Sequence, residues 1–482
     1  MSPSRKSNPL APDWLRVPAD ANALTPGLWS PNVGRSTVGE MTVAGVRVSD
    51  LVEQYGTPLY VLDEQHVRDQ AVRVREAFER EATKARTSVR VYYAGKAFLS
   101  TEVARWVTEE GLSIDVASGG ELAVVLAAGV DPKLIGVHGN NKSVAEIERA
   151  VRAGVGTIVV DASIEVARVA AVASAAGVVQ RVRLRVNSGV HAHTHDFLAT
   201  AHEDQKFGIT IEDAPAVVAL IRAQPSLAFV GLHCHIGSQI FGTAAFAESA
   251  SRLLELHANL SKDGDVPELN LGGGFGIAYT PADTPASIDE IAAGLVGAVA
   301  AECQRLRIPV PVIAIEPGRI IVGTAGLTLY RVGVTKDVRV DLDPAEAGKR
   351  GPTSAVRRYV SVDGGMSDNA RPALYSADYS VRIANRVSNA DPVLVRIAGK
   401  HCESGDILIR SDYLPGDVTV GDILAVPATG AYCFSLSSNY NYLARPAVVA
   451  VREWRSRVIV RGETEHDLLS RDAGIRPTED FL

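Results

Sequence analysis

Lys96 is the first residue of the chain whose type and position suggest chemistry. It follows residues 89–94, a run of alternating and aromatic residues typical of a β-strand, and a helical pattern begins near Ser100. A lysine placed where a strand gives way to a loop lies over the open end of a sheet. Most lysines are only solvated surface charges, so the other polar residues of the chain decide whether Lys96 has a function.

Polar and glycine residues also follow seven other strand-like segments. They are Asp115 with Ser118, His-Gly-Asn-Asn-Lys at 138–142, Asp161, Arg185 with Asn187, His-Cys-His-Ile-Gly-Ser at 233–238, Gly-Gly-Gly-Phe-Gly at 272–276 and Glu-Pro-Gly-Arg at 316–319. In a barrel of parallel strands the carboxyl ends of all strands meet at one mouth, where the active sites of this fold are built. Because every predicted strand end carries such residues, we predict a catalytic barrel.

The glycine run at 272–276 indicates an anion site. Glycines let backbone N–H groups approach and surround a phosphate, and the helix that follows adds the dipole of its N-terminus. Loops after the seventh and eighth strands are the usual phosphate site of a (β/α)8 barrel. A tight structural turn is the alternative explanation of this run.

Glu316 ends the eighth apolar segment, and a buried carboxylate there needs a cationic partner. Arg319 could be that partner, and a pyridinium nitrogen would serve as well. A lysine, a phosphate cradle and an acid in one mouth are what pyridoxal phosphate requires. The lysine binds the cofactor covalently, the glycines hold its phosphate, and the acid keeps the ring nitrogen protonated.

Alternating histidines offer a competing hypothesis. Residues 191–195 hold three and residues 233–235 hold two, and barrel metallohydrolases use such pairs. Those enzymes usually gather metal ligands near the first strand and an Asp at the last, where this chain has Lys96 and Glu316. We therefore predict no metal. His235 is better used as a flat ring stacked on a cofactor, with a hydrogen-bonded core histidine as the alternative.

Strand-like and helix-like segments alternate over the middle of the chain. Strands are predicted at 89–94, 113–116, 134–137, 157–160, 181–187, 228–233, 268–271 and 312–316, and helices at 65–84, 101–110, 120–128, 143–153, 163–176, 212–223, 244–260 and 287–306. Eight such units match a (β/α)8 TIM-type barrel. An open doubly wound sheet is the alternative, but it usually carries a GxGxxG turn after its first strand, where this chain has Lys96.

The remaining segments predict three further parts. Residues 1–36 lack a clear period and are expected to form an N-terminal arm, part of which docks on the body because it contains two tryptophans. The barrel is expected at 64–319. Short apolar runs separated by Gly, Pro and Asp turns predict that 37–63 and 320–482 form a C-terminal β-domain, a β-sandwich or Greek-key arrangement. Residues 341–355 are expected to be an exposed insertion.

Composition excludes several classes of protein. The 482 residues carry a net charge of −7, which disfavours nucleic acid and anionic membranes as partners. No apolar run is long enough to cross a membrane. The four cysteines form no CxxC pair, so reduced thiols in a cytoplasmic enzyme are expected.

Taken together, these motifs resemble those of the diaminopimelate decarboxylases, in the fold-type III pyridoxal-phosphate group that also contains alanine racemase and ornithine decarboxylase. The matching segments lie in the family's order at 93–97, 115–118, 138–142, 235–238, 272–276, 316–319, 371–375, 402–404 and 430–432. The resemblance covers residues 40–455. It implies decarboxylation of meso-2,6-diaminopimelate to L-lysine and carbon dioxide, the last step of lysine biosynthesis.

The resemblance also implies a role for each matching residue. Lys96 would carry the cofactor covalently, and Cys402 would return a proton after carbon dioxide leaves. The residues implied to bind the cofactor are Lys96, Asp115, His235, Ser238, Gly274, Glu316, Gly318, Arg319 and Tyr432. Those implied to bind the substrate are Arg319, Arg371, Tyr375, Glu403 and Tyr432. In this family the site is shared across a homodimer, so Cys402 and Glu403 would complete the site of a second copy.

The charges of the predicted site residues also favour diaminopimelate as the substrate. Two arginines, Arg319 and Arg371, suit the distal carboxylate of diaminopimelate, and Glu403 suits its ammonium group. A decarboxylase of ornithine or arginine, an amino-acid racemase with a second base in place of Cys402, and a non-catalytic pyridoxal-phosphate-binding relative are the alternatives. The chain departs from the family at 200–202, where Thr-Ala-His stands in place of the usual Thr-Gly.

Overall fold

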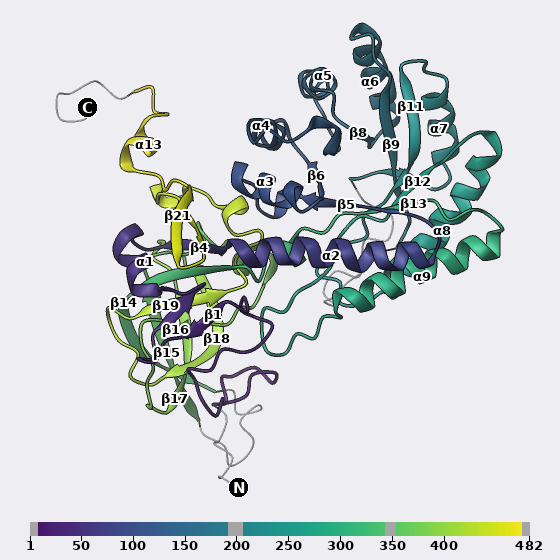
Figure 1. Cartoon of the computed structure of the whole chain (residues 1–482). Coiled ribbons are helices and arrows are strands. Elements are labelled where there is room, and N and C mark those ends of the chain that lie inside the picture. Colours follow the sequence, from purple (N-terminus) through teal and green to yellow (C-terminus); the bar gives the residue numbers. More distant parts are fainter. Residues whose placement is uncertain (1–7, 191–205, 343–352, 475–482) are drawn as a thin grey trace. The chain divides into compact units, whose positions relative to one another are not determined.

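The computed structural model describes residues 8–190, 206–342 and 353–474. The chain divides into two compact units (Figure 1). The barrel unit contains residues 67–277 and 284–322. The β-unit contains the chain up to residue 66, residues 278–283 and the chain from residue 323 onward. The two units are described separately.

Eight parallel strands form a closed ring in the barrel unit. They are β5 (Val89–Ala94), β6 (Ser113–Val116), β7 (Ile135–Val137), β8 (Thr157–Val160), β9 (Gln180–Asn187), β11 (Leu227–His233), β12 (Glu268–Asn270) and β13 (Val312–Ile315). Pairing of β8 with β9 and of β13 with β5 completes the ring. A two-residue strand, β10 (Ile209–Thr210), pairs beside β9. The predicted (β/α)8 barrel is therefore confirmed, and each of the eight predicted strands is present within one residue of its predicted bounds.

Helices alternate with these strands along the chain. They are α2 (Glu64–Lys84), α3 (Thr101–Glu109), α4 (Gly119–Ala127), α5 (Val144–Ala153), α6 (Ser163–Ala175), α7 (Ala214–Arg222), α8 (Ala244–Leu260), α9 (Ile288–Leu306) and α10 (Arg319–Val322). Local sequence signals fix several ends, because α5 and α9 both begin with a Ser–Glu capping box at Ser143 and Ser287. The helix predicted at 244–260 from the helical periodicity of the sequence has the same bounds as α8.

A buried ion pair and a hydrogen bond link the strands β5, β9 and β12 inside the barrel. Arg183 of β9 has no exposed side-chain surface, and its Nη2 atom donates to Glu268 of β12 at 2.7 Å and to the Tyr92 hydroxyl of β5 at 3.0 Å. The guanidinium also lies 5.0 Å from the centre of the Tyr92 ring. Removing one partner of such a buried pair leaves an uncompensated charge and costs about 3–5 kcal/mol.

The β-unit is built on a largely antiparallel sheet. Its strands run in the spatial order β18 (Ile407–Pro415), β17 (Pro392–Ala398), β15 (Ser354–Val362), β14 (Gly326–Asp341), β4 (Leu59–Asp63), β20 (Val448–Arg452) and β21 (Arg455–Val460). The strand β19 (Ile423–Pro427) pairs with β14 and with β16 (Arg382–Ile383). A small sheet of β1 (Val33–Arg35), β2 (Met41–Val43) and β3 (Val46–Arg47) and the helix α1 (Val48–Tyr55) contribute to the same apolar core. The predicted β-rich second part is confirmed.

The N-terminal segment packs against this unit from residue 8 onward. Leu15 is buried against Leu394 and Tyr413, and Trp29 is buried in the core that contains β4 and β14. Docking of part of the predicted arm is therefore confirmed. Of the predicted insertion at 341–355, residues 343–352 lie outside the described residues.

Sequence reasoning missed the strand β18. Its centre, Arg410 to Asp412, is polar, so it lacks the apolar run by which the strands of this unit are predicted. The structure buries Asp412 there, where it accepts hydrogen bonds from the Val381 N–H at 2.8 Å and from Arg382 at 3.1 Å. These two contacts, which form only in the folded chain, offset the free-energy cost of burying the Asp412 carboxylate inside a strand.

Among the described helices, none combines the length and apolar character that crossing a bilayer requires.

The fold predicts a pH-dependent stability through His257. This residue of α8 is 5% exposed, its Nδ1 atom has no hydrogen-bond partner among the described residues, and burial lowers its pKa to about 4. The unfolded chain binds the proton near pH 6.5, so the free energy of unfolding falls as the pH drops from 6.5 to 4. We expect His257→Leu to reduce the slope of Tm against pH in that window.

The matched control is His466→Leu, which removes an exposed imidazole from α13 (Glu465–Leu469). A His257→Leu slope equal to that of the unmodified chain would contradict this account.

Candidate active site

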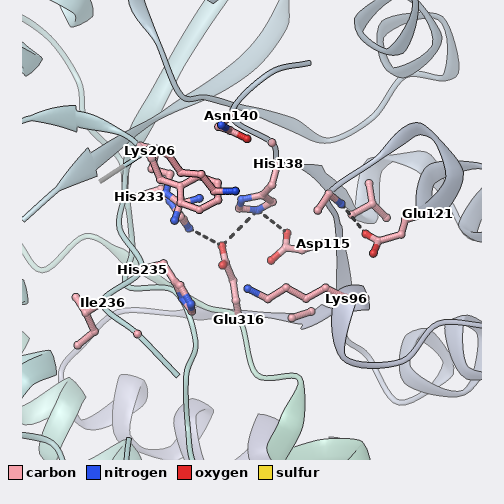
Figure 2. A pocket seen from close by; sticks show the side chains of 18 residues that line it. Lys96, Asp115, Glu121, His138, Asn140, Lys206, His233, His235, Ile236 and Glu316 are labelled. Carbon is pink, nitrogen blue, oxygen red and sulfur yellow. Dashed lines mark hydrogen bonds and ion pairs between the residues drawn. The ribbon is translucent and has the colours of Figure 1, made fainter. Parts of the chain in front are cut away.

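A cavity of about 630 Å³ lies at the carboxyl ends of the barrel strands. Its lining includes Lys96 after β5, Asp115 in β6, His138 after β7, Arg185 in β9, His233 in β11 and Glu316 after β13. Figure 2 shows the side chains of Lys96, Asp115, His138, His233 and Glu316 arranged around one space. The structure therefore brings together residues from six of the eight strand ends. Asp161, which follows β8, is instead buried, and it accepts a hydrogen bond from Gly208 N–H at 3.1 Å.

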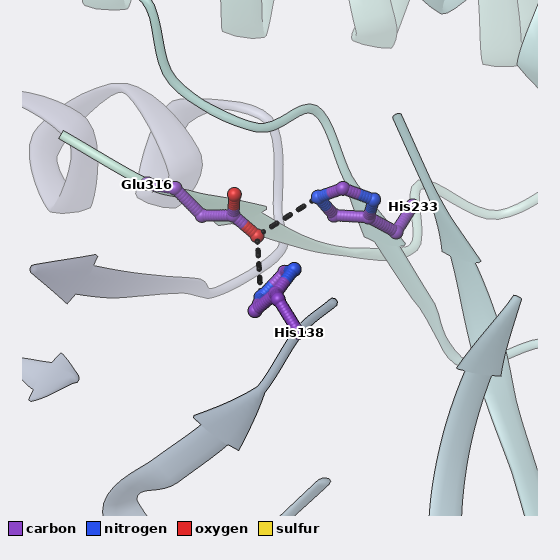
Figure 3. A group of neighbouring side chains, drawn as sticks. All are labelled: His138, His233 and Glu316. Atoms are coloured by element: carbon purple, nitrogen blue, oxygen red, sulfur yellow. Dashed lines mark ion pairs between the residues drawn. The ribbon is translucent and has the colours of Figure 1, made fainter. Parts of the chain in front are cut away.

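Glu316 is the centre of the polar groups in this cavity. Its Oε1 atom accepts a hydrogen bond from Asn270 Nδ2 at 2.7 Å, and it lies 3.0 Å from His233 Nε2 and 3.4 Å from His138 Nε2 (Figure 3). His138 Nε2 also lies 3.2 Å from Asp115 Oδ1. Three nitrogen atoms from different strands thus surround a single carboxylate oxygen.

Burial sets the charge of these groups. It lowers the pKa of both His138 and His233 to about 4, so both rings are neutral near pH 7. Burial raises the pKa of Asp115 well above its usual range, and the negative charge of Glu316 raises it further. Burial alone would raise the pKa of Glu316, but the surrounding imidazoles, first His233 and then His138, outweigh it and hold that pKa well below its usual range. Glu316 is therefore the ionised member of the group.

Lys96 and His235 lie on the same side of the cavity as Glu316 (Figure 2). Lys96 is exposed, in the short turn Gly95–Ala97. The Nδ1 atom of His235 accepts a hydrogen bond from the Gly273 N–H at 3.3 Å. Burial, followed by the charge of Lys96, lowers the pKa of His235 well below its usual range, so the ring is neutral.

The glycine run at 272–276 packs closely against its neighbours. A Cβ atom at Gly273 would lie 1.9 Å from the Glu316 carbonyl oxygen, and one at Gly274 would lie 2.3 Å from the Gly237 carbonyl oxygen. Gly274 also has φ of 113°, which favours glycine. Its N–H has no hydrogen-bond acceptor among the described residues, so it is available to an anion. Arg319 Nη2 donates to Ser238 Oγ at 2.9 Å.

These residues fit pyridoxal phosphate. A carboxylate, a flat neutral imidazole and an amine surround one cavity, and the Gly274 N–H offers a donor to a phosphate. The sites predicted in the barrel unit at Lys96, Asp115, His235 and Glu316 all line this cavity. Ser238, Gly274, Gly318 and Arg319 lie in the segments that follow the lining strands.

The other predicted site residues belong to the β-unit. Cys402 and Glu403 are exposed, and Tyr375 is 64% exposed at the end of α12 (Arg371–Tyr375). Arg371 is buried, with its guanidinium 4.4 Å from the centre of the Tyr279 ring and donating to the Tyr379 hydroxyl. Tyr432 has a positive φ of 61°.

His138, His233 and Glu316 also offer ligand atoms for a metal, all within 4.8 Å of one another. His233 contributes to this group, whereas its neighbour His235 bonds to the glycine run, so the two do not act as a pair. The three histidines at 191–195 lie outside the described residues. Asn270 already donates to the Glu316 oxygen that the two imidazoles approach.

Sequence reasoning assigned no role in cofactor binding to His138, His233 or Asn270, and considered His233 only in the rejected metal hypothesis. His138 and His233 were visible only as members of motifs. Asn270 is completely buried at the end of β12, between Leu269 and Leu271. An amide side chain at such a position could have identified Asn270 from the sequence, because a buried polar group needs hydrogen-bond partners.

Comparisons with known proteins agree with this geometry. Residues 65–323 match the family model described as "Pyridoxal-dependent decarboxylase, pyridoxal binding domain". The diaminopimelate decarboxylase of Mycobacterium tuberculosis (strain ATCC 25618 / H37Rv) is 49% identical over 93% of this chain and 98% of that protein. That of Bacillus subtilis (strain 168) is 43% identical over 90% of this chain and 95% of that protein. The crystal structure of diaminopimelate decarboxylase from M. jannaschii in complex with L-lysine has a TM-score of 0.82 at 31% identity, and covers 93% of this chain and 98% of that one.

The crowding around Gly273 gives a test of the site's architecture. We expect Gly273→Ala to lower the free energy of unfolding by about 1–3 kcal/mol, because the new methyl group overlaps the backbone that carries Glu316. Urea unfolding measures the change.

The matched control is Gly297→Ala on the exposed side of α9, where no atom lies within 4 Å of the added carbon. It should gain about 0.5–1 kcal/mol, because alanine favours the helix. If Gly273→Ala unfolds at the same urea concentration as the unmodified chain, the described packing is wrong.

Proposed function

The chain belongs to the diaminopimelate decarboxylase family of pyridoxal-dependent decarboxylases, and we propose that it converts meso-2,6-diaminopimelate to L-lysine and carbon dioxide with pyridoxal phosphate. The observation that carries this proposal is the meeting of Lys96, His235 and Glu316 at one barrel cavity. A relative that is 49% identical over nearly its whole length carries the same function in its name.

The chain's own residues suit each part of the cofactor. Lys96 supplies the amine that binds it covalently, His235 offers a flat face to the ring, and Glu316 holds the proton of the ring nitrogen. Gly274, Ser238 and Arg319 suit the phosphate. When bound, pyridoxal phosphate supplies an electron sink for the electron pair that remains when a carboxyl group leaves.

The residues proposed to bind the substrate come from both units. Diaminopimelate has a second amino-acid end, and Arg319 and Arg371 match its carboxylate while Glu403 matches its ammonium group. Tyr375 and Tyr432 are proposed to contact the same end. Cys402 is proposed to donate a proton to the carbon that loses carbon dioxide, a role that suits its exposed thiol.

A homodimer with shared sites forms part of the proposal. Cys402, Glu403 and Tyr375 are exposed in a single chain, as expected of groups that serve the site of a second copy. Tyr442 of the same unit is a large aromatic side chain that is 69% exposed, and aromatic residues are common in interfaces. The cytoplasmic location stays a prediction.

Carbon dioxide release tests the proposed reaction. The purified chain with pyridoxal phosphate should release carbon dioxide from meso-diaminopimelate, with lysine formed in equal amount, and at least tenfold faster than from ornithine or arginine. The preference follows from the pairing of the distal carboxylate with two arginines. Lys96→Ala is the control, because it removes the covalent anchor and should abolish release. Faster release from ornithine or arginine, or release from none of the three, would reject the proposed substrate.

Mixed variants test the shared site. Lys96→Ala and Cys402→Ala are each expected to be inactive as homodimers. If one site combines Lys96 of one subunit with Cys402 of the other, a hybrid contains one intact site and one doubly altered site. Unfolding and refolding an equal mixture should therefore restore about a quarter of the unmodified activity.

Each variant taken alone through the same procedure is the control. Hybrid dimers that form but stay inactive would show that Lys96 and Cys402 of the same subunit serve one site.

A further inference from the structure

Three nitrogen atoms approach Oε1 of Glu316 within the cavity. Asn270 Nδ2 donates to it at 2.7 Å, and the Nε2 atoms of His233 and His138 approach it to 3.0 and 3.4 Å. The two rings meet edge to face with centroids 5.0 Å apart. Of these three, Asn270 alone meets hydrogen-bond geometry, whereas the two imidazole nitrogens lie within ion-pair distance without a hydrogen-bond partner in the described part of the chain. Together the three contacts restrict the direction of the carboxylate.

The strands that carry these groups leave them little freedom. His233 is the last residue of β11, Asn270 the last of β12, and Glu316 and His138 follow β13 and β7. Asn270 and His233 are at most 1% exposed. Backbone pairing joins β11 to β12 and β12 to β13. His233, Asn270 and Glu316 therefore come from neighbouring strands of one sheet. Pairing of neighbouring strands sets three of the four positions, and closure of the barrel brings His138 from β7 to the same oxygen.

The charges around Glu316 also match a single cation. His138 and His233 are neutral near pH 7, burial and the charge of Glu316 raise the pKa of Asp115, and the pKa of Glu316 is held low, so Glu316 carries a negative charge there. Other charged or titratable groups that act on this cluster from neighbouring elements are Lys96, Lys142, Arg183, Arg185, Cys234 and His235. One negative charge is what a single protonated ring nitrogen requires.

We propose that His233 and His138 are positioning residues that hold Glu316 through its Oε1 atom in the orientation needed by the cofactor's ring nitrogen, with His233 as the principal contact. This inference rests on the proposed function and assigns roles to two residues that have none among the proposed cofactor contacts. His233 acts through Glu316 and does not touch the reacting atoms.

A metal site is the competing explanation of the same three residues. Two observations disfavour it. Asn270 already occupies the shared oxygen with its donor, and the Nδ1 atom of His233 has no hydrogen-bond partner among the described residues. Metal-bound histidines almost always donate their second nitrogen to such a partner, which orients the ring.

Three variants of the full chain test the proposal. His233→Leu removes the contact, and His233→Gln replaces Nε2 with an amide nitrogen of similar reach. His257→Leu is the matched control, because it makes the same change at a buried histidine of α8 that no site contact involves. Each protein is stripped of cofactor and titrated with pyridoxal phosphate, followed by absorbance. Turnover of diaminopimelate is then measured at saturating cofactor.

We expect His233→Leu to bind pyridoxal phosphate at least tenfold more weakly, and to lose at least tenfold in kcat with KM changed less than threefold. The absorbance of its bound cofactor should change between pH 6 and 9, where that of the unmodified chain is constant. His233→Gln should recover most of both losses, and His257→Leu should match the unmodified chain. If His233→Leu fails to fold, His138→Gln and His138→Leu replace the pair, with smaller effects of the same sign.

Three results would overturn the proposal: unchanged affinity and kcat in the leucine variant, a glutamine variant no better than the leucine variant, or one zinc ion per chain in the purified protein. These results can be distinguished from a failure of the proposed function. The affinity comparison needs no substrate, whereas the function fails if the unmodified chain binds cofactor but releases no carbon dioxide from diaminopimelate.

Discussion

Pairing of β8 with β9 and of β13 with β5 turns eight parallel strands into a closed ring, and the whole site depends on that closure. A closed ring forces the carboxyl ends of all strands to one mouth. Lys96 after the first strand and Glu316 after the last are far apart in sequence but become neighbours there (Figure 2). An open sheet with the same order of elements would leave these two strand ends on opposite edges.

Closure also has an electrostatic consequence. It buries two carboxyl groups and two imidazoles in one small space, where not all of them can be charged. In the cavity both imidazoles are neutral near pH 7, and the pKa of Asp115 is raised while that of Glu316 is lowered. The surviving charge on Glu316 is then paired with surrounding nitrogen atoms, as a buried carboxylate requires.

The predicted site divides between two units for a physical reason. A barrel mouth offers groups that hold a rigid cofactor, because strand ends are fixed by backbone pairing. Cys402, Glu403 and Tyr375 lie on turns and short helices of the β-unit, where side chains are exposed and loops can vary. This division suits a common cofactor chemistry combined with a changeable substrate pocket.

Much of the fold was readable in the sequence alone. The eight barrel strands and α8 could be located because a strand period of two and a helix period of 3.6 are local properties of the chain. Lys96, His235 and Glu316 were identified because each stands at a strand end or in a recognisable motif. The strand β18 was missed because Asp412 only becomes tolerable inside a strand once Arg382 pairs with it.

The sequence by itself therefore determined the elements, their order and the residue types that line one mouth. Only the tertiary structure decided that His138, His233 and Asn270 meet at a single oxygen of Glu316. That meeting depends on the register between strands distant in sequence and on closure of the ring. Local periodicity contains no information about either.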